Sequence, residues 1–171
     1  VRLNGGGNNY NNKPVILGLI KSEKVNQLGN LFVITGRRTF SACQNLVNEI
    51  ENYTNALFVG EPTGENVNFY GDVRSEILPN SEIPIRLSYM WWQDKDPRDI
   101  RPWTPPDVPV ELSSEDYFSN HDPMLETILT QDGFEKAKDP MQHLQELFEA
   151  GKTQELQETA FRYINDPKLK Y

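Results

Sequence analysis

The chain has 171 residues, a net charge of −8 and 37% hydrophobic residues, enough for one domain with its own core and a small appendage. The negative charge argues against nucleic acid or an anionic membrane surface as a partner. No apolar run approaches the roughly 18 residues that a membrane-spanning helix needs. A single cysteine, Cys43, excludes an internal disulfide, and two histidines, His121 and His143, do not make a zinc cluster. We therefore expect no metal and no cofactor.

The first residues are typical of a strand end that runs into a glycine-rich loop. Residues 1–3 are followed by Asn4 and by Gly5, Gly6 and Gly7, which let a backbone approach another group closely. A flexible linker is the alternative interpretation of this loop. Because the chain has no initiator Met and starts inside a strand pattern, we expect it to be an N-terminally truncated piece of a longer protein. Residues 14–20 form a short apolar run, which we interpret as a strand or loop.

Residues 31–60 predict a strand, a helix and a second strand. The apolar run 31–34 indicates a buried strand. In residues 41–53, apolar side chains recur at helical spacing and share one face: Cys43, Leu46, Val47, Ile50 and Tyr53. The apolar run 56–60 completes a right-handed βαβ unit.

Ser41 is the first residue of the predicted helix and follows the strand and its turn. Free N–H groups and the helix dipole favour negative charge at such a position, so a serine there could attack a carbonyl while an N–H holds the oxyanion. The alternative is a capping box, in which Ser41 and Gln44 satisfy backbone donors and do no chemistry.

The second half of the chain is less regular. Residues 76–78 and 83–89 predict antiparallel strands with one covered face, because apolar side chains alternate along the second segment. Tryptophans around the loop 93–101 could line a substrate cleft or pack in the core. Helices are expected to start near Ser114 and Asp122, and residues 140–150 and 153–164 form a helical hairpin. We divide the chain into residues 1–132 and an appendage, residues 133–171, which should dock on the main domain or on a partner.

Three segments, in order, resemble the C-terminal processing (tail-specific) peptidase family and its tricorn-core relatives. Residues 1–7, Val-Arg-Leu-Asn-Gly-Gly-Gly, resemble the family's Asp-Leu-Arg-x-Asn-x-Gly-Gly loop. Residues 39–42, Thr-Phe-Ser-Ala, resemble its Thr-x-Ser-Ala nucleophile motif, and residues 57–64 resemble the following strand with its Gly-Glu-x-Thr loop. Residues 103–110 are similar to the family's late Pro-Asp strand, so the resemblance covers about residues 1–110.

The resemblance implies a crotonase/ClpP-like α/β fold, present here as a partial βαβ core with antiparallel strands and a C-terminal helical hairpin. It implies a bacterial serine peptidase that hydrolyses peptide bonds, often near the substrate's C-terminus. Carried over by motif, Ser41 would be the nucleophile. The Ala42 N–H and the N–H of Gly6 or Gly7 would form the oxyanion hole. An extracytoplasmic location agrees with the family, and the sequence leaves the compartment open.

The chain departs from the family pattern at the base. Asn66 stands where processing peptidases have a catalytic lysine, so we do not expect a Ser-Lys dyad. Tricorn-like members use a histidine that precedes the glycine loop, which would lie before Val1, and a late acidic residue. Asp99 is the candidate acid, with Asp96 and Glu65 as alternatives, and solvated surface charge is the competing explanation for each.

The sequence therefore predicts a serine peptidase that acts on peptides or proteins through an acyl-enzyme on Ser41. The alternative is a catalytically inactive, protease-like module that binds peptides. With the base missing, we expect the 171-residue chain alone to be inactive on peptides. We also expect it to self-associate or to bind the missing N-terminal half, because a sheet without its first strands exposes an edge.

Overall fold

The computed structural model describes residues 1–130 and 140–165. The chain forms two compact units, Val1–Glu135 and Lys136–Tyr171, which are described separately. The boundary that the sequence predicts, between residues 132 and 133, lies outside the described residues.

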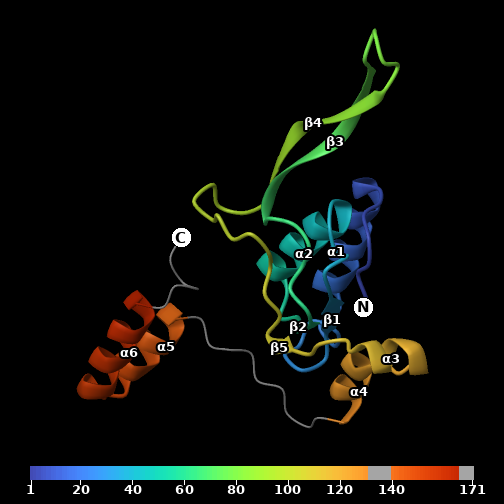
Figure 1. Ribbon diagram of the computed structural model, residues 1–171. Coiled ribbons are helices and arrows are strands. Elements are labelled where there is room, and N and C mark those ends of the chain that lie inside the picture. The colour runs from blue at the N-terminus through green and yellow to red at the C-terminus, as the bar shows by residue number, and fades with distance from the viewer. Residues whose placement is uncertain (131–139, 166–171) are drawn as a thin grey trace. The chain divides into compact units, whose positions relative to one another are not determined.

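A parallel sheet forms the centre of the first unit (Figure 1). Its strands are β1 (Phe32–Thr35), β2 (Leu57–Gly60) and β5 (Val108–Pro109), in the order β1-β2-β5. Residues 1–3 run parallel to β1, with the Leu3 N–H donating to Ile34 O at 3.0 Å. Helix α2 (Ala42–Tyr53) connects β1 to β2, so the predicted βαβ unit is confirmed and the fold is mixed α/β.

Helices cover both faces of this sheet. Helices α1 (Asn12–Lys21) and α2 pack on one face, where the largest apolar cluster contains Leu3, Ile16, Leu31, Val33, Leu46, Val47, Ile50, Ala56 and Phe58. On the other face, Met124 of α4 (Pro123–Thr130) packs with Ile34 and Val59. Successive strand residues point to opposite faces of the sheet, and both faces are covered. The strands are therefore continuous apolar runs in the sequence.

Two predictions about helices α1 and α2 are wrong. Residues 14–20 belong to helix α1, because Ile16 and Leu19 lie on one helical face that packs against the core. Tyr53, expected on the buried face of α2, is 61% exposed. It is the last residue of the helix, where the chain turns toward β2.

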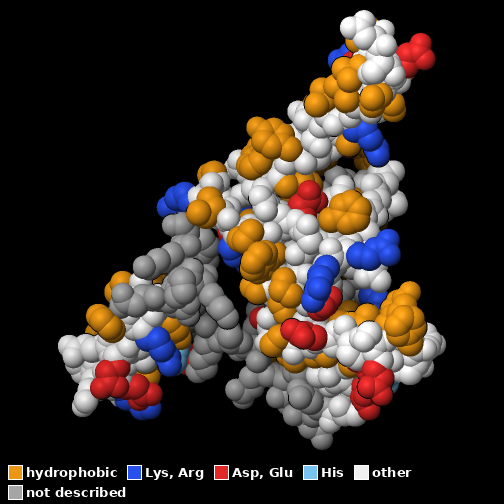
Figure 2. Space-filling model, in the orientation of Figure 1, with side chains coloured by type: hydrophobic (Ala, Val, Ile, Leu, Met, Phe, Trp, Pro, Cys, Tyr) orange, Lys and Arg blue, Asp and Glu red, His pale blue; other side chains and the backbone are white. Residues whose placement is uncertain are grey.

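The antiparallel strands are longer than the sequence indicates and form a hairpin of their own. Strands β3 (Asn68–Ile77) and β4 (Pro84–Gln93) pair along nearly their whole length and extend beyond the parallel sheet (Figure 1). The prediction of a covered face is wrong, because Leu87 and Tyr89 are more than half exposed. Figure 2 shows hydrophobic side chains gathered along this hairpin.

The remaining helices follow the last strand of the sheet. Helix α3 (Ser114–Ser119) begins where the sequence predicts a helix start, and the structure adds a capping box, in which Ser113 and Asp116 satisfy each other's backbone N–H groups. In the second unit, α5 (Pro140–Glu149) and α6 (Thr153–Asn165) form the predicted helical hairpin. Leu147 is buried between them, and His143 Nδ1 lies 2.7 Å from the Tyr163 hydroxyl. Within the described residues, no helix has the length and apolar character needed to cross a membrane.

Candidate active site

Ser41 has an unusual backbone conformation. It occupies the position before the first residue of α2 with φ 56° and ψ −128°, a region that side chains other than glycine rarely adopt. Such a conformation costs about 1–3 kcal/mol and persists only where the surroundings impose it. A serine on a strained turn between a strand and a helix is the geometry that presents a nucleophile at the end of a sheet.

The capping-box interpretation of Ser41 is wrong. The Ser41 side chain makes no capping hydrogen bond. Gln44 does not reach back to the helix start, because its amide is fully buried and donates to Asn48 Oδ1 at 2.9 Å and Thr104 Oγ1 at 3.0 Å. The hydroxyl of Ser41 forms no hydrogen bond with another described side chain and is left free for chemistry.

The glycine loop lies directly against Ser41. A Cβ placed on Gly6 would lie 3.0 Å from Ser41 Cβ and 3.4 Å from its Oγ, so a side chain at this position would crowd the serine. Gly5 adopts φ 81° and donates its N–H to Arg38 O at 2.6 Å, which fixes the loop to the turn before the nucleophile. A Cβ on Gly7 would meet nothing within 4 Å. Of the two glycines predicted for the oxyanion hole, Gly6 is the one beside the nucleophile.

Thr39 bonds to three segments of the site: the N-terminal residues, the turn before Ser41 and the loop after β2. It is fully buried, and its hydroxyl donates to Leu3 O at 2.5 Å and accepts from the Gly36 N–H at 3.1 Å. Its carbonyl accepts from the Gly64 N–H, in the loop after β2, at 2.9 Å. A Cβ on Gly64 would lie 2.1 Å from Arg37 O, so only glycine allows this loop to pack on the nucleophile turn.

Ala42 supplies a backbone donor beside the nucleophile. Its N–H is one of the first four of α2, which have no acceptor inside the helix, and the helix dipole adds partial positive charge there. The Asn12 side chain, which is buried, donates to Ala42 O at 2.9 Å and so fixes the next peptide, between Ala42 and Cys43. An N–H held in place at a helix start can stabilise a developing oxyanion without reorganisation.

A carboxylate also lies at Ser41. The Ser41 N–H donates to Glu65 Oε2 at 2.5 Å. Burial raises the pKa of the Glu65 carboxyl, and the hydrogen bond from the Ser41 N–H opposes that rise without cancelling it. Asn66, which follows, is exposed, so the position that carries a lysine in processing peptidases faces solvent here.

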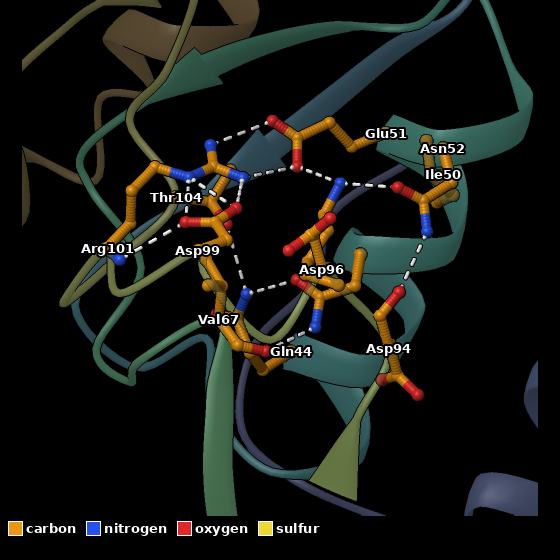
Figure 3. A network of polar contacts seen from close by, with 12 residues as sticks. Gln44, Ile50, Glu51, Asn52, Val67, Asp94, Asp96, Asp99, Arg101 and Thr104 are labelled. Carbon is orange, nitrogen blue, oxygen red and sulfur yellow. Dashed lines mark hydrogen bonds and ion pairs between the residues drawn. The ribbon is translucent and has the colours of Figure 1, made fainter. Parts of the chain in front are cut away.

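Asp99 belongs to a separate ionic network (Figure 3). It is 5% exposed, and its carboxylate accepts two hydrogen bonds at 3.0 Å and one at 2.7 Å from the Arg101 guanidinium. Arg101 also binds Glu51 of α2, at 3.0 and 3.1 Å, and Lys95 pairs with the same glutamate. No contact joins Asp99 to Ser41 among the described residues, so its role as the late acid stays a prediction.

The other alternative acid, Asp96, lies at the surface. Its carboxylate pairs with the Arg98 guanidinium at 2.7 Å, and the hydrogen bonds from Arg98 lower the Asp96 pKa well below its usual range.

A pocket of about 160 Å³ opens beside this loop, with Asn66, Trp91, Asp99 and Ile100 among its walls. Trp91 therefore lines a surface hollow and is 47% exposed. The described residues contain no group of three or more histidine, cysteine or acidic side chains arranged to hold a metal ion.

The burial of the polar face of α2 could not be recognised from the sequence. Gln44 and Asn48 are fully buried, and Glu51 continues the same face. Polar side chains at spacing i, i+4 and i+7 normally indicate a solvated face. Here Thr104 and Arg101, in the loop between β4 and β5, bind Gln44 and Glu51, and Asn48 donates to Val67 O at 2.7 Å. Among the described residues, Gln44 Oε1 and Asn45 Oδ1 are buried without a hydrogen-bond partner.

Comparisons with known proteins give a distant structural likeness. No protein-family model matches the sequence, and no curated protein matches it significantly. One similar solved structure is that of a candidate peptidase from Parabacteroides merdae, with a TM-score of 0.44, 24% identity and 60% of this chain covered. Another is that of a candidate S41 protease from Bacteroides fragilis, with a TM-score of 0.39, 19% identity and 58% covered. The chain spans 32% and 24% of the lengths of these two proteins.

Replacing Gly6 with alanine tests the close approach of the glycine loop. The added methyl group would meet Ser41 Cβ at 3.0 Å, so the loop or the serine must shift. We expect reaction of Ser41 with an acylating or phosphonylating reagent to slow by about 10- to 100-fold, because small displacements at a reacting centre have effects of this size. Gly7→Ala is the matched control and should react at the wild-type rate. Equal rates for both variants would contradict the assigned geometry.

Proposed function

We propose that this chain carries the nucleophile and the oxyanion hole of a serine peptidase. The observation that carries the proposal is Ser41 itself, which is held at φ 56° with its hydroxyl beside Gly6 and its neighbour's N–H at the helix start. Strain of this kind is maintained where a function requires it. The order of the three motifs in the sequence supports the same conclusion.

In the proposed reaction, Ser41 Oγ attacks the carbonyl carbon of a peptide bond. The N–H groups of Ala42 and Gly6 hold the oxyanion, the amine leaves with a proton, and water then hydrolyses the ester on Ser41. The resemblance assigns the base to a histidine that precedes the glycine loop, and Asp99 stays the proposed late acid. A crotonase/ClpP-like core and a tail-specific or tricorn-like substrate choice are the finer parts of the proposal.

A fluorophosphonate probe tests this proposal on the native protein. We expect a single covalent adduct, which peptide mapping by mass spectrometry should locate on Ser41. Ser88, an exposed serine of β4, is the internal control and should stay unmodified. A protein that binds peptides but leaves Ser41 unlabelled would contradict the enzymatic proposal.

That outcome would favour a second candidate function, an inactive protease-like module that binds peptides. The specific observation behind it is that Asn66 is exposed at the family's lysine position, with no histidine or lysine bonded to the Ser41 hydroxyl among the described residues.

A further inference from the structure

Glu65 is a carboxylate that the proposed mechanism does not use, although it touches the nucleophile. Its Oε2 accepts the Ser41 N–H at 2.5 Å, which fixes the side chain at the end of the sheet where the proposed substrate would lie. The other oxygen, Oε1, accepts no hydrogen bond from a described residue. The anchored carboxylate therefore has one oxygen engaged and one available.

Glu65 also has no cationic partner within the described part of the chain. In the turn before Ser41 and the loop after β2, the other charged residues are Arg37, Arg38 and Glu61, and Arg37 is paired with Glu61 at 3.0 Å. The loop between β4 and β5 also bonds to the loop after β2, but its cations are paired with other carboxylates: Lys95 with Glu51, Arg98 with Asp96, and Arg101 with Asp99 and Glu51. Ser41 contributes only a backbone N–H, and Gly6 contributes no charge from the glycine loop. A half-buried carboxylate with a raised pKa and no counterion is stabilised by any cation brought beside it.

From these contacts we propose that Glu65 selects peptides that carry a positive charge within one or two residues of the bond attacked by Ser41. This inference rests on the proposed function of Ser41. An extended peptide advances about 3.3–3.6 Å per residue, so only groups this close to the scissile bond reach a carboxylate hydrogen-bonded to the nucleophile's own N–H. The cation is either the side chain of a lysine or arginine, or a free α-amine at the start of the peptide. Both donate charge-assisted hydrogen bonds to a carboxylate.

The test measures binding by the shift of the Ser41 backbone amide in NMR spectra, a signal that needs no turnover. Acetyl-Ala-Lys-amide is compared with acetyl-Ala-norleucine-amide, which lacks only the charged end. Ala-Ala-amide with a free α-amine is compared with its acetylated form. We expect one of the two cationic peptides to bind at least roughly tenfold more tightly than its neutral partner, and the pair that differs identifies the source of the cation.

Glu65→Gln should reduce that preference to about twofold or less, while Glu61→Gln, in the same loop, should leave it unchanged. In the wild type, the preference should disappear as the pH falls through the raised pKa of Glu65, and Glu65→Gln should remove this pH dependence. No preference in the wild type, or a preference that survives in Glu65→Gln, would overturn the proposal.

The labelling of Ser41 by a neutral fluorophosphonate separates this inference from the proposed function. If Glu65 acts on substrate charge alone, Ser41 should still be labelled in Glu65→Gln, because the glutamine oxygen can accept the Ser41 N–H as the carboxylate does. Loss of labelling in Glu65→Gln would show that the carboxylate serves the chemistry of Ser41 and would overturn the role in selection. A charge preference in a protein whose Ser41 is never labelled would overturn the catalytic proposal and keep Glu65 as a peptide-binding residue.

Discussion

Replacing Ser41 with alanine is expected to lower kcat for peptide hydrolysis by the native protein at least ~10³-fold, because only binding and the oxyanion hole would remain. Alanine, like serine, carries a Cβ, so the strained conformation at φ 56° should cost the variant about as much as the wild type. The loss should therefore appear in kcat with little change in the free energy of unfolding. Steady-state kinetics with a fluorogenic peptide measure it.

Ser88→Ala, at an exposed position of β4, is the control for this experiment and should keep wild-type kinetics. Turnover that is unchanged in Ser41→Ala would show that another residue is the nucleophile. Equal losses in both variants would point to unfolding, which circular dichroism would detect independently.

Replacing Arg101 with methionine should have the largest effect on stability. The Arg101 side chain is 24% exposed and its guanidinium binds Asp99 and Glu51, so its removal leaves two carboxylates poorly compensated in a largely buried site. Breaking a buried ion pair on one side costs about 3–5 kcal/mol, and the partial exposure of Arg101 places the expected loss near the lower limit, about 3 kcal/mol. Urea unfolding followed by fluorescence or circular dichroism measures the change.

Arg98→Met is the matched control. Arg98 pairs with Asp96 at the surface, with 81% of its side chain exposed, and such exposed, solvent-screened pairs contribute little to stability. The two arginines lie in the same loop and each binds an aspartate two residues earlier. Similar losses in both variants would contradict the structural role assigned to the Glu51, Asp99 and Arg101 network.

The Glu51, Asp99 and Arg101 network also predicts the direction in which stability changes with pH. Burial raises the pKa of Glu51, but hydrogen bonds and charge from Arg101 and Lys95 outweigh it, so the pKa lies below its usual value of 4.5. A lowered carboxylate pKa contributes stability that is present above the unfolded-state pKa and is lost as the pH falls through the folded-state value. Arg101→Met should therefore lose less stability than the wild type on acidification below pH 4.5.

The local structure around the nucleophile could be predicted from the sequence because its signals are short-range. Apolar runs on either side of a helical repeat specify a βαβ unit, and a serine at the start of that helix has free N–H groups beside it whatever the rest of the fold does. The proximity of the glycine loop to Ser41 was also accessible, through the resemblance. The error in residues 14–20 has a local cause as well, since a short apolar run does not distinguish strand from helix.

Long-range packing decided what the sequence left open. Whether Ser41 and Gln44 form a capping box depended on the Gln44 side chain, which binds Thr104, sixty residues away, and so excludes the box. Alternating apolar side chains normally indicate a covered strand face, but on the β3–β4 hairpin they are exposed. Polar side chains at helical spacing normally indicate a solvated face, but on α2 they are buried. In both cases, a distant segment of the chain decides whether the face is covered. The role of Glu65 could not be predicted from the sequence for the same reason. Its charge is visible in the sequence, but its contact with the Ser41 N–H forms only when the loop after β2 packs on Thr39.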